Sequence, residues 1–237
     1  MSEPLFPDAP LSGIDEAGIP LTTGFKVSLQ TILAQVAQAA KRLFDLGAAS
    51  TLLLLSAPLL IAVAVLVAID GGSIFFRHRR VGRNGETFSC LKFRTMIIGA
   101  EECLDEYLSY HPDAQLEWAK EQKLSFDPRV TSVGRFLRQS SIDELPQLIN
   151  VIKGHMSLVG PRPVTKSELV HYGFATSLYK SVRPGITGLW QVSGRNDVAY
   201  DVRVKLDEQY VRHWTLLADL RILLRTPAVV ISRRGAR

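Results

Sequence analysis

The longest hydrophobic segment of the chain covers residues 46–69, and none of these 24 residues carries a charged side chain. At about 1.5 Å per residue, a helix of this length crosses a hydrocarbon core of about 30 Å. The segment starts far from Met1 and no small-residue cleavage pattern follows it, which disfavours a secretory signal. We therefore predict a membrane helix here, preceded by a lead-in helix over residues 27–40.

Ser56 and Pro58 interrupt this segment near its centre. The proline removes a helix hydrogen bond, and the serine hydroxyl can compensate a freed carbonyl. Two arrangements satisfy the pattern: a kinked helix that spans the membrane, or a helix hairpin that bends at Ser56 to Pro58 and returns to the same face. The segment has basic residues on both sides, namely Lys41, Arg42, Arg77, Arg79, Arg80 and Arg83. Because cytoplasmic flanks are enriched in such residues, we favour the re-entrant hairpin with both ends on the cytoplasmic face.

The polar and apolar positions after the membrane helix predict a small β-hairpin followed by helices. Two apolar stretches, 74–76 and 87–91, flank Arg83-Asn84-Gly85, and Asn-Gly between apolar stretches is a strong hairpin signal. A charged helical region covers 101–123 with an interruption around Pro112, and a further helix begins at Thr131. We therefore predict a mainly α protein with a small β-hairpin, in the α+β class.

The net charge of +5 matters less than the arrangement of the basic residues. Residues 221–237 contain five arginines and no acidic residue, interleaved with apolar side chains. Such a basic amphipathic tail fits an anionic membrane surface. No recognition-helix, zinc or aromatic-platform motif accompanies it, so we expect no nucleic-acid partner. The two cysteines, Cys90 and Cys103, form no metal-binding pattern.

The adjacent carboxylates of Asp143 and Glu144 stand just before Pro146, which restricts where the next helix can begin. Pro146 has no amide hydrogen, so we expect it in the first turn of a helix over 148–152. Asp143 then lies near the N-cap, where free amides and the helix dipole favour an ionised carboxylate and a bound phosphate. An ionised carboxylate is a nucleophile. The alternative is an ordinary acidic N-cap with no catalytic role.

Three arginines accompany these carboxylates in stiff segments of the chain. Arg138 precedes them, Arg162 lies in Gly-Pro-Arg-Pro at 160–163, and Arg183 opens Arg-Pro-Gly-Ile-Thr-Gly. Guanidinium groups held in fixed positions suit bidentate binding of phosphate. The combination favours chemistry on a phosphate-bearing substrate.

Several longer motifs follow one another in a fixed order over residues 41–225. They begin at Lys41 (KRLFD), Lys92 (KFRTM), Asp143 (DELPQL), Asn150 (NVIKG), Met156 (MSLVGPRP), Arg183 (RPGITG) and Gly194 (GRN), with Pro58 in the apolar segment. In these motifs the chain resembles the bacterial sugar transferases, the monotopic polyprenol-phosphate hexose-1-phosphate transferases that prime exopolysaccharide and glycan synthesis. We expect the compact type of this family, without a set of spanning helices ahead of the catalytic part.

The resemblance implies transfer of a sugar phosphate from a UDP-hexose to undecaprenyl phosphate, with release of UMP, on the cytoplasmic face of the bacterial inner membrane. In the family, the aspartate that matches Asp143 is the nucleophile and forms a covalent phosphosugar intermediate, and the glutamate that matches Glu144 binds Mg2+. Both roles agree with general chemistry. Mg2+ often shares its oxygen ligands between a carboxylate and substrate phosphates, and a nucleophilic carboxylate divides the transfer into two displacements. The resemblance leaves homo-oligomerisation open.

The same motifs supply the candidate binding residues. We expect substrate phosphate at Lys92, Arg94, Arg138 and Arg162, and, from motif position, nucleotide contacts at Gln191, Arg195 and Asn196. An ordinary surface or ion-pair role is the alternative for each cation. We divide the chain into a disordered leader (1–24), a lead-in and membrane helix (25–72), and a cytoplasmic catalytic domain on the membrane surface (73–237). Two rival functions remain: a non-catalytic membrane scaffold for glycan assembly, and a lipid-linked phosphatase.

Overall fold

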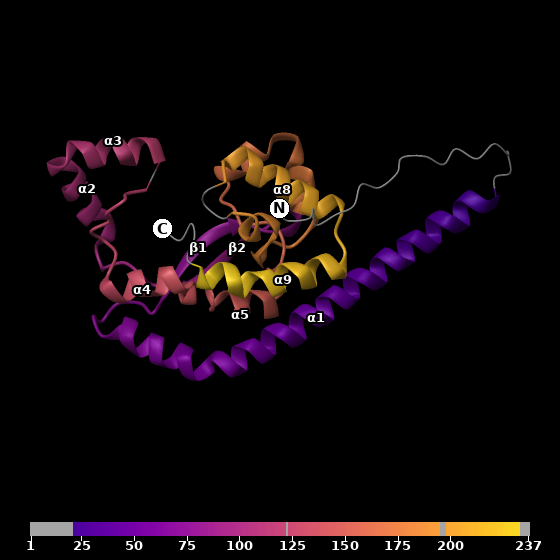
Figure 1. Ribbon diagram of the computed structural model, residues 1–237, viewed down its shortest axis with the longest axis horizontal. Coiled ribbons are helices and arrows are strands. Elements are labelled where there is room, and N and C mark those ends of the chain that lie inside the picture. The colour runs from indigo at the N-terminus through magenta and orange to yellow at the C-terminus, as the bar shows by residue number, and fades with distance from the viewer. Residues whose placement is uncertain (1–20, 122, 195–197, 233–237) are drawn as a thin grey trace.

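The computed structural model describes residues 21–121, 123–194 and 198–232 and shows a mostly helical chain (Figure 1). The α-helices are α1 (Leu21–Ala68), α2 (Ala100–Tyr110), α3 (Pro112–Glu121), α4 (Ser132–Ser140), α5 (Gln147–Ile152), α6 (Thr176–Ser181), α7 (Leu189–Val192), α8 (Tyr200–Arg212) and α9 (Leu216–Ile231). The 3₁₀ turns are η1 (Arg83–Gly85), η2 (Ile142–Glu144) and η3 (Glu168–Ala175), and the strands are β1 (Phe75–Val81), β2 (Thr87–Phe93), β3 (Ser157–Val159) and β4 (Gly185–Thr187). The predicted mainly helical chain with a small hairpin is confirmed.

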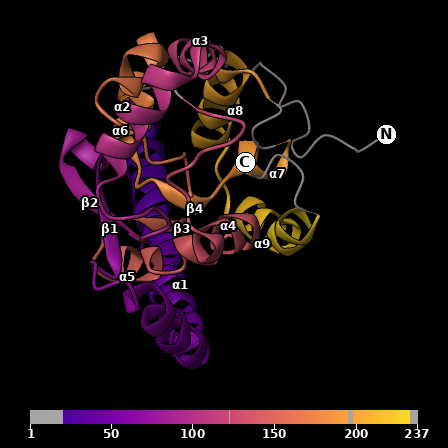
Figure 2. The same ribbon diagram turned by 90° about the vertical axis from the view of Figure 1, so that its left-hand side faces the viewer.

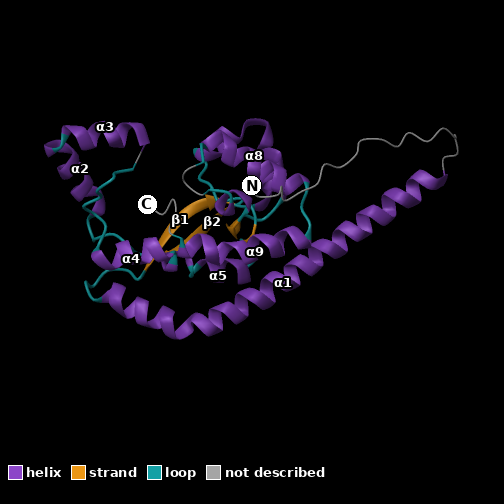
Figure 3. Ribbon diagram, viewed as in Figure 1, coloured by secondary structure: helices purple, strands orange, loops and turns teal. Residues whose placement is uncertain are grey.

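The predicted hairpin is formed by β1 and β2. The strands pair antiparallel, with Val81 opposite Thr87 next to the turn and Phe75 opposite Phe93 at the far end. Asn84 adopts a left-handed conformation with φ of 59°, as its position before a glycine in a tight turn favours. In Figure 3 these strands lie among the helices, and Phe93 at the end of β2 packs against Val63 and Val67 of α1.

A second sheet was not predicted. It consists of β3 and β4, three residues each, paired parallel with Ser157 opposite Gly185. A side chain at Gly185 would meet the backbone nitrogen of Gly160 at 2.1 Å, so the close approach of these two segments requires glycine there. Strands this short leave no alternating pattern in the sequence.

Helix α1 joins the predicted lead-in helix and the apolar segment into one element of 48 residues. It begins at Leu21, inside the segment predicted as a leader, and residues 1–20 lie outside the described residues. The predicted break at Ser56 and Pro58 is wrong, because the helix continues through both residues and is bent rather than interrupted (Figure 1). The Ser56 hydroxyl donates to the carbonyl of Leu53 at 3.3 Å, and not to the Leu54 carbonyl that Pro58 leaves without its helical donor.

Both ends of the apolar part of α1 are attached to the rest of the domain. At one end, Lys41 Nζ donates to Asp219 Oδ2 at 2.6 Å, and the Arg42 guanidinium donates to the Val151 carbonyl at 2.7 Å. At the other end, the Arg94 guanidinium binds Asp70. Figure 2 gives a second view of α1 running along the domain. The two flanks of the apolar segment therefore lie on the same side of the molecule.

One face of α1 belongs to the protein core, and the opposite face is exposed. The core brings together Ala49 of α1, Phe88 and Cys90 of β2, Leu148 and Val151 of α5, and Ile222 of α9. The exposed apolar side chains of α1 include Leu52, Leu54, Leu55, Leu59, Ile61, Val65, Leu66 and Ile69. Among the described residues, Thr31–Ala68 is long and apolar enough to cross a membrane. An exposed apolar surface of this extent marks an interaction site, and lipid fits its composition.

The segment predicted as an interrupted charged helix forms an arm of two helices, α2 and α3, separated at His111. Its return to the domain is fixed by Arg129, whose guanidinium binds Asp127 at 2.7 and 2.8 Å and lies 5.0 Å from the centre of the Trp118 ring. The predicted start of the next helix at Thr131 is confirmed, because its hydroxyl accepts from the Gly134 amide at 2.8 Å as an N-cap.

Candidate active site

Asp143 lies in the 3₁₀ turn η2, which leads from α4 into α5. The turn starts at Ser141, whose φ of 57° reverses the chain after α4. Pro146, three residues after Asp143, occupies the N-cap position of α5 with helical backbone angles. Asp143 is therefore close to the predicted N-cap but three residues before it, and the α5 dipole does not set its ionisation.

Burial determines the properties of Asp143. Asp143 is only 7% exposed. This burial raises the pKa of Asp143 to about 6; the negative charge of Glu144 acts in the same direction, while Lys92 and Arg138 oppose it. At neutral pH the carboxylate is thus largely ionised, yet its burial leaves it poorly hydrated. That combination suits a nucleophile.

Lys92 approaches the carboxylates from the hairpin. It lies near the end of β2, opposite Phe76, and its Nζ donates to Glu144 Oε1 at 2.5 Å. Both side chains of this ion pair are partly exposed. Lys92 therefore sets the direction of the Glu144 carboxylate and brings a positive charge next to Asp143.

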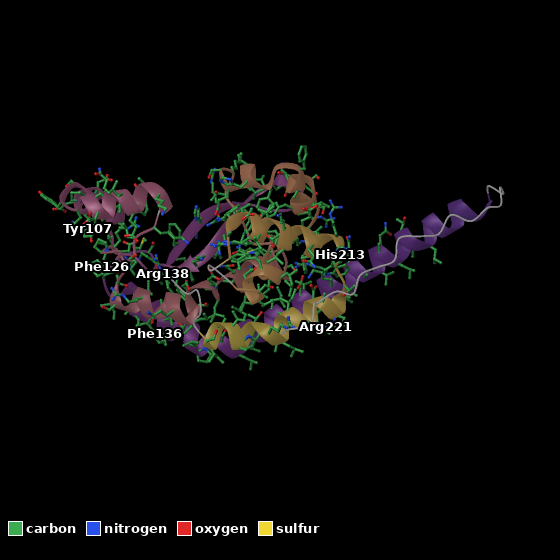
Figure 4. The ribbon with its side chains drawn as sticks, turned by 45° about the horizontal axis from the view of Figure 1, so that its top comes forward. Tyr107, Phe126, Phe136, Arg138, His213 and Arg221 are labelled. Carbon is green, nitrogen blue, oxygen red and sulfur yellow. The ribbon has the colours of Figure 1, made fainter. Side chains whose placement is uncertain are left out.

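Arg138 approaches from the last turn of α4. Its Nε donates to Thr95 Oγ1 at 2.9 Å, and its guanidinium interacts electrostatically with Asp127 and Asp143. Burial lowers the pKa of the Arg138 guanidinium, but an arginine remains protonated in proteins. In Figure 4, Arg138 lies at the end of the domain that carries α4 and the α2–α3 arm. Two cations, Lys92 on β2 and Arg138 on α4, therefore act electrostatically on Asp143.

Arg94, another cation predicted to bind phosphate, lies apart from this group in the structure. Its guanidinium donates to both oxygens of Asp70, to the Ser73 carbonyl at 2.7 Å and to the Val67 carbonyl at 2.7 Å. These bonds use its donors to hold the C-terminal end of α1 against the hairpin. Arg94 therefore attaches the C-terminal end of α1 to the domain.

Arg162 lies in a second cluster around Trp190. The Arg162 guanidinium lies 5.7 Å from the centre of the Trp190 ring, and that of Arg203 on α8 lies 4.9 Å from it. Trp190 is buried, and its indole nitrogen and the neighbouring Gln191 Oε1 have no hydrogen-bond partner among the described residues. The cluster therefore combines two cations on an aromatic ring with a buried donor and a buried acceptor. Arg195 and Asn196, the other predicted nucleotide contacts, lie outside the described residues.

The two groups of residues border the same part of the hairpin. Burial is the main reason why the pKa of Cys90 on β2 is raised to about 11, and Lys92, Glu144, Arg80 and Arg162 all act electrostatically on this thiol. Charged residues of both groups therefore lie within electrostatic range of the same strand. Sequence reasoning missed Trp190 and Arg203; Trp190 stands next to the predicted Gln191, whereas Arg203 gave no signal in a charged helix.

Asp207 lies next to the backbone of Arg162. It is almost fully buried on α8, and the Tyr172 hydroxyl donates to its Oδ2 at 2.8 Å. Burial raises the pKa of Asp207 to about 7, against 3.8 for a free aspartate. The folded state therefore holds a proton that the unfolded state releases, so stability falls as pH rises from about 4 to about 7.

We expect Asp207→Asn to remove this dependence. Relative to the variant, the wild-type protein should lose roughly 2 to 3 kcal/mol of stability between pH 5 and pH 8, the equivalent of two pKa units. Thermal unfolding of both proteins in detergent across this pH range measures the effect. Parallel pH profiles of the two midpoints would contradict the assignment.

Mg2+ fits this site only together with a phosphate ligand. The described residues contain no group of three or more His, Cys, Asp or Glu side chains that could hold a metal ion. Asp143 and Glu144 nevertheless place two adjacent carboxylates beside a strip of cations. Mg2+ is commonly bound by one or two carboxylates plus substrate phosphates, so the donor set suits an ion that arrives with a diphosphate.

Residues 36–233 match the model of one protein family, the bacterial sugar transferases. The chain belongs to this family. It is 56% identical over 196 residues to the exopolysaccharide production protein ExoY of Rhizobium meliloti, covering 82% of this chain and 87% of that protein. It is 51% identical to the undecaprenyl-phosphate galactose phosphotransferase of Salmonella typhimurium and 39% identical to the undecaprenyl-phosphate glucose phosphotransferase of Komagataeibacter xylinus. The alignments cover 83% of this chain in both cases, but 41% and 36% of those longer proteins. The transferase is therefore an enzyme of the phosphoglycosyl transferase type, and the resemblance in its motifs is confirmed.

Proposed function

We propose that this transferase moves a hexose 1-phosphate from a UDP-sugar to undecaprenyl phosphate and releases UMP, as the priming step of exopolysaccharide or glycan synthesis. The observation that carries the proposal is the buried carboxylate of Asp143 with Lys92 and Arg138 on either side. The names of the relatives support a lipid carrier as acceptor, because two of them are undecaprenyl-phosphate hexose phosphotransferases.

The chemistry consists of two displacements at one phosphorus atom. An oxygen of the ionised Asp143 carboxylate bonds to the sugar-bearing phosphorus of the donor, and the bond from that phosphorus to the bridging oxygen breaks, so UMP leaves with the electron pair. A phosphate oxygen of the acceptor then bonds to the same phosphorus, and the acyl phosphate bond breaks. This returns the carboxylate to Asp143. Lys92, Arg138 and Arg162 neutralise the phosphate charge in both steps.

Glu144 is the residue that would hold Mg2+ together with donor phosphate oxygens. When bound, the ion supplies positive charge to the leaving UMP. Lys92 keeps Glu144 directed towards this position in the absence of substrate, because the two side chains are ion-paired at 2.5 Å. Glu144 would thus bind the ion while Asp143 acts as the nucleophile, because one carboxylate could not do both at once.

We also propose that the enzyme is attached to the cytoplasmic face of the inner membrane by a re-entrant α1. Support comes from the attachment of both flanks of the apolar segment to the same domain, through Lys41 and through Arg94. A helix that crossed the bilayer would place these flanks on opposite sides. The bend in α1 and its exposed apolar side chains fit shallow insertion into one leaflet (Figure 1).

Cysteine labelling tests this topology. Cysteines placed singly at Ala39 and Ser73, both exposed, flank the apolar segment, and the native Cys90 and Cys103 are replaced by serine or alanine. We expect neither position to react with an impermeant maleimide in intact spheroplasts, and both to react in inside-out vesicles. Labelling of only one position from outside would show that α1 spans the membrane.

Release of UMP from a panel of UDP-hexoses tests the function itself. The purified enzyme in detergent is given each donor with Mg2+ or with EDTA, and with or without undecaprenyl phosphate. Lipid-dependent and Mg2+-dependent UMP release from one donor would establish the reaction and name the sugar. Release of inorganic phosphate would favour a phosphatase, and a folded protein that releases nothing would favour a scaffold.

A further inference from the structure

We infer that an apolar pocket between α1, the hairpin and α5 holds the first isoprene units of the acceptor lipid, so that the lipid phosphate reaches Asp143 from the membrane side. The inference rests on the proposed function. It adds the position of the acceptor chain and the direction from which the acceptor enters the site.

The pocket has a volume of about 180 Å3. Its walls are Leu60 and Ala64 of α1, Phe75 and Phe93 of the hairpin, and Pro146 and Ile149 of the segment that forms α5. Every one of these side chains is apolar. An apolar cavity of about 150 Å3 is large enough to bind benzene, so a branched isoprene unit fits the size and chemistry of this pocket.

One end of the pocket borders the catalytic residues. Pro146 follows Glu144 by two residues, and Phe93 belongs to the apolar cluster against which Ile142, the residue before Asp143, packs. Phe75 stacks on Phe93 with the ring centres 5.4 Å apart, which keeps this wall in place. A ligand with an anionic phosphate and an apolar chain therefore finds a cation and an apolar pocket next to each other.

The other end of the pocket is open to the exposed face of α1. Ile61 lines the pocket and is also 65% exposed. Val65, one helical turn further along this face, is exposed as well. If this face contacts lipid, an isoprenoid chain can pass from the bilayer into the pocket without crossing water. Entry from the aqueous side would instead expose the whole chain, which is unfavourable.

The pocket can be filled by substitution and compared with a matched control. Ala64→Phe places a ring in the pocket, whereas Ala62→Phe places the same ring on the exposed face of the same helix. Ile61→Trp fills the pocket from its exposed side and carries little risk of misfolding, because Ile61 is not part of the core. The two half-reactions give two readouts: the burst of UMP from the UDP-sugar without acceptor, and steady-state UMP release as a function of undecaprenyl phosphate.

We expect Ala64→Phe and Ile61→Trp to raise the KM for undecaprenyl phosphate at least about tenfold, and to leave the amplitude and rate of the UMP burst unchanged. Ala62→Phe should leave both readouts unchanged. A normal KM in Ile61→Trp together with an intact burst would overturn the inference, as would an equal rise in Ala62→Phe, which would indicate general lipid contact. If the burst is lost in Ala64→Phe alone, that variant is misfolded and Ile61→Trp decides. A wild-type enzyme with no burst and no lipid-dependent UMP release would overturn the proposed function as well.

Discussion

Asp143→Asn is expected to reduce UMP release by at least about a thousandfold, because the substitution removes the nucleophile while nearly preserving its shape. The variant should remain folded and membrane-bound. Burial raises the pKa of Asp143 to about 6, so the ionised carboxylate is unfavourable in the folded state at neutral pH. The neutral amide should therefore leave the thermal midpoint unchanged or raise it.

The decisive measurement is trapping of the covalent intermediate. Wild-type enzyme incubated with a UDP-sugar labelled in the sugar, without acceptor, should retain label after denaturation, and Asp143→Asn should retain none. Asp105→Asn, on the exposed side of α2, is a control for the chemical change alone and should behave as wild type. A labelled and active Asp143→Asn would remove Asp143 from the mechanism.

Features with a local signal were predicted well. The hairpin turn at Asn84-Gly85 requires positive φ, and Asn-Gly is the dipeptide that adopts it most readily. The start of α4 at Thr131 and the separation of α2 from α3 before Pro112 follow in the same way from capping and from the properties of proline. Each of these features depends on only a few neighbouring residues.

The offset of Asp143 from the N-cap of α5 has a physical cause. The prediction considered Pro146 alone and assumed that α5 began at once, so the preceding acid was placed near its cap. In the structure Ser141 takes positive φ and starts a separate 3₁₀ turn. A serine in this conformation is uncommon and nothing local announces it. Burial of Asp143, which controls its pKa, depends on elements far away in the sequence.

Lys92 and Arg94 show that tertiary contacts give two similar side chains different partners. Lys92 and Arg94 are two residues apart, so a strand places them on the same face, and both looked equally suited to phosphate. Lys92 meets Glu144, 52 residues away, whereas Arg94 meets Asp70 at the end of α1. The position of η2 decides the partner of Lys92 and the path of α1 decides that of Arg94, and the sequence motif contains no information about either.

Asp219→Ala is expected to have the largest effect on stability. Asp219 is almost fully buried and accepts hydrogen bonds from Lys41 Nζ at 2.6 Å, from the Tyr210 hydroxyl at 2.7 Å and from the Trp214 indole at 3.0 Å. Removal of the carboxylate takes the charged partner from Lys41 and the acceptor from the Trp214 indole, and it leaves the Val159 carbonyl to accept from both Lys41 and Tyr210. Loss of one partner of a buried ion pair costs roughly 3 to 5 kcal/mol, which corresponds to a fall in the thermal midpoint on the order of 10 °C.

An exposed ion pair provides the contrast for this experiment. Glu208 and Arg212 lie one turn apart on α8 with Arg212 more than half exposed, and Glu208→Ala should change stability by less than about 1 kcal/mol. A double-mutant cycle with Lys41→Met and Asp219→Asn measures the coupling of the pair, since asparagine keeps the shape of the side chain and one of its two acceptor oxygens. A coupling energy near zero would mean that Lys41 does not hold α1 to the domain. A large one would show that this ion pair stabilises the attachment of α1 to the domain, because the pair joins them directly.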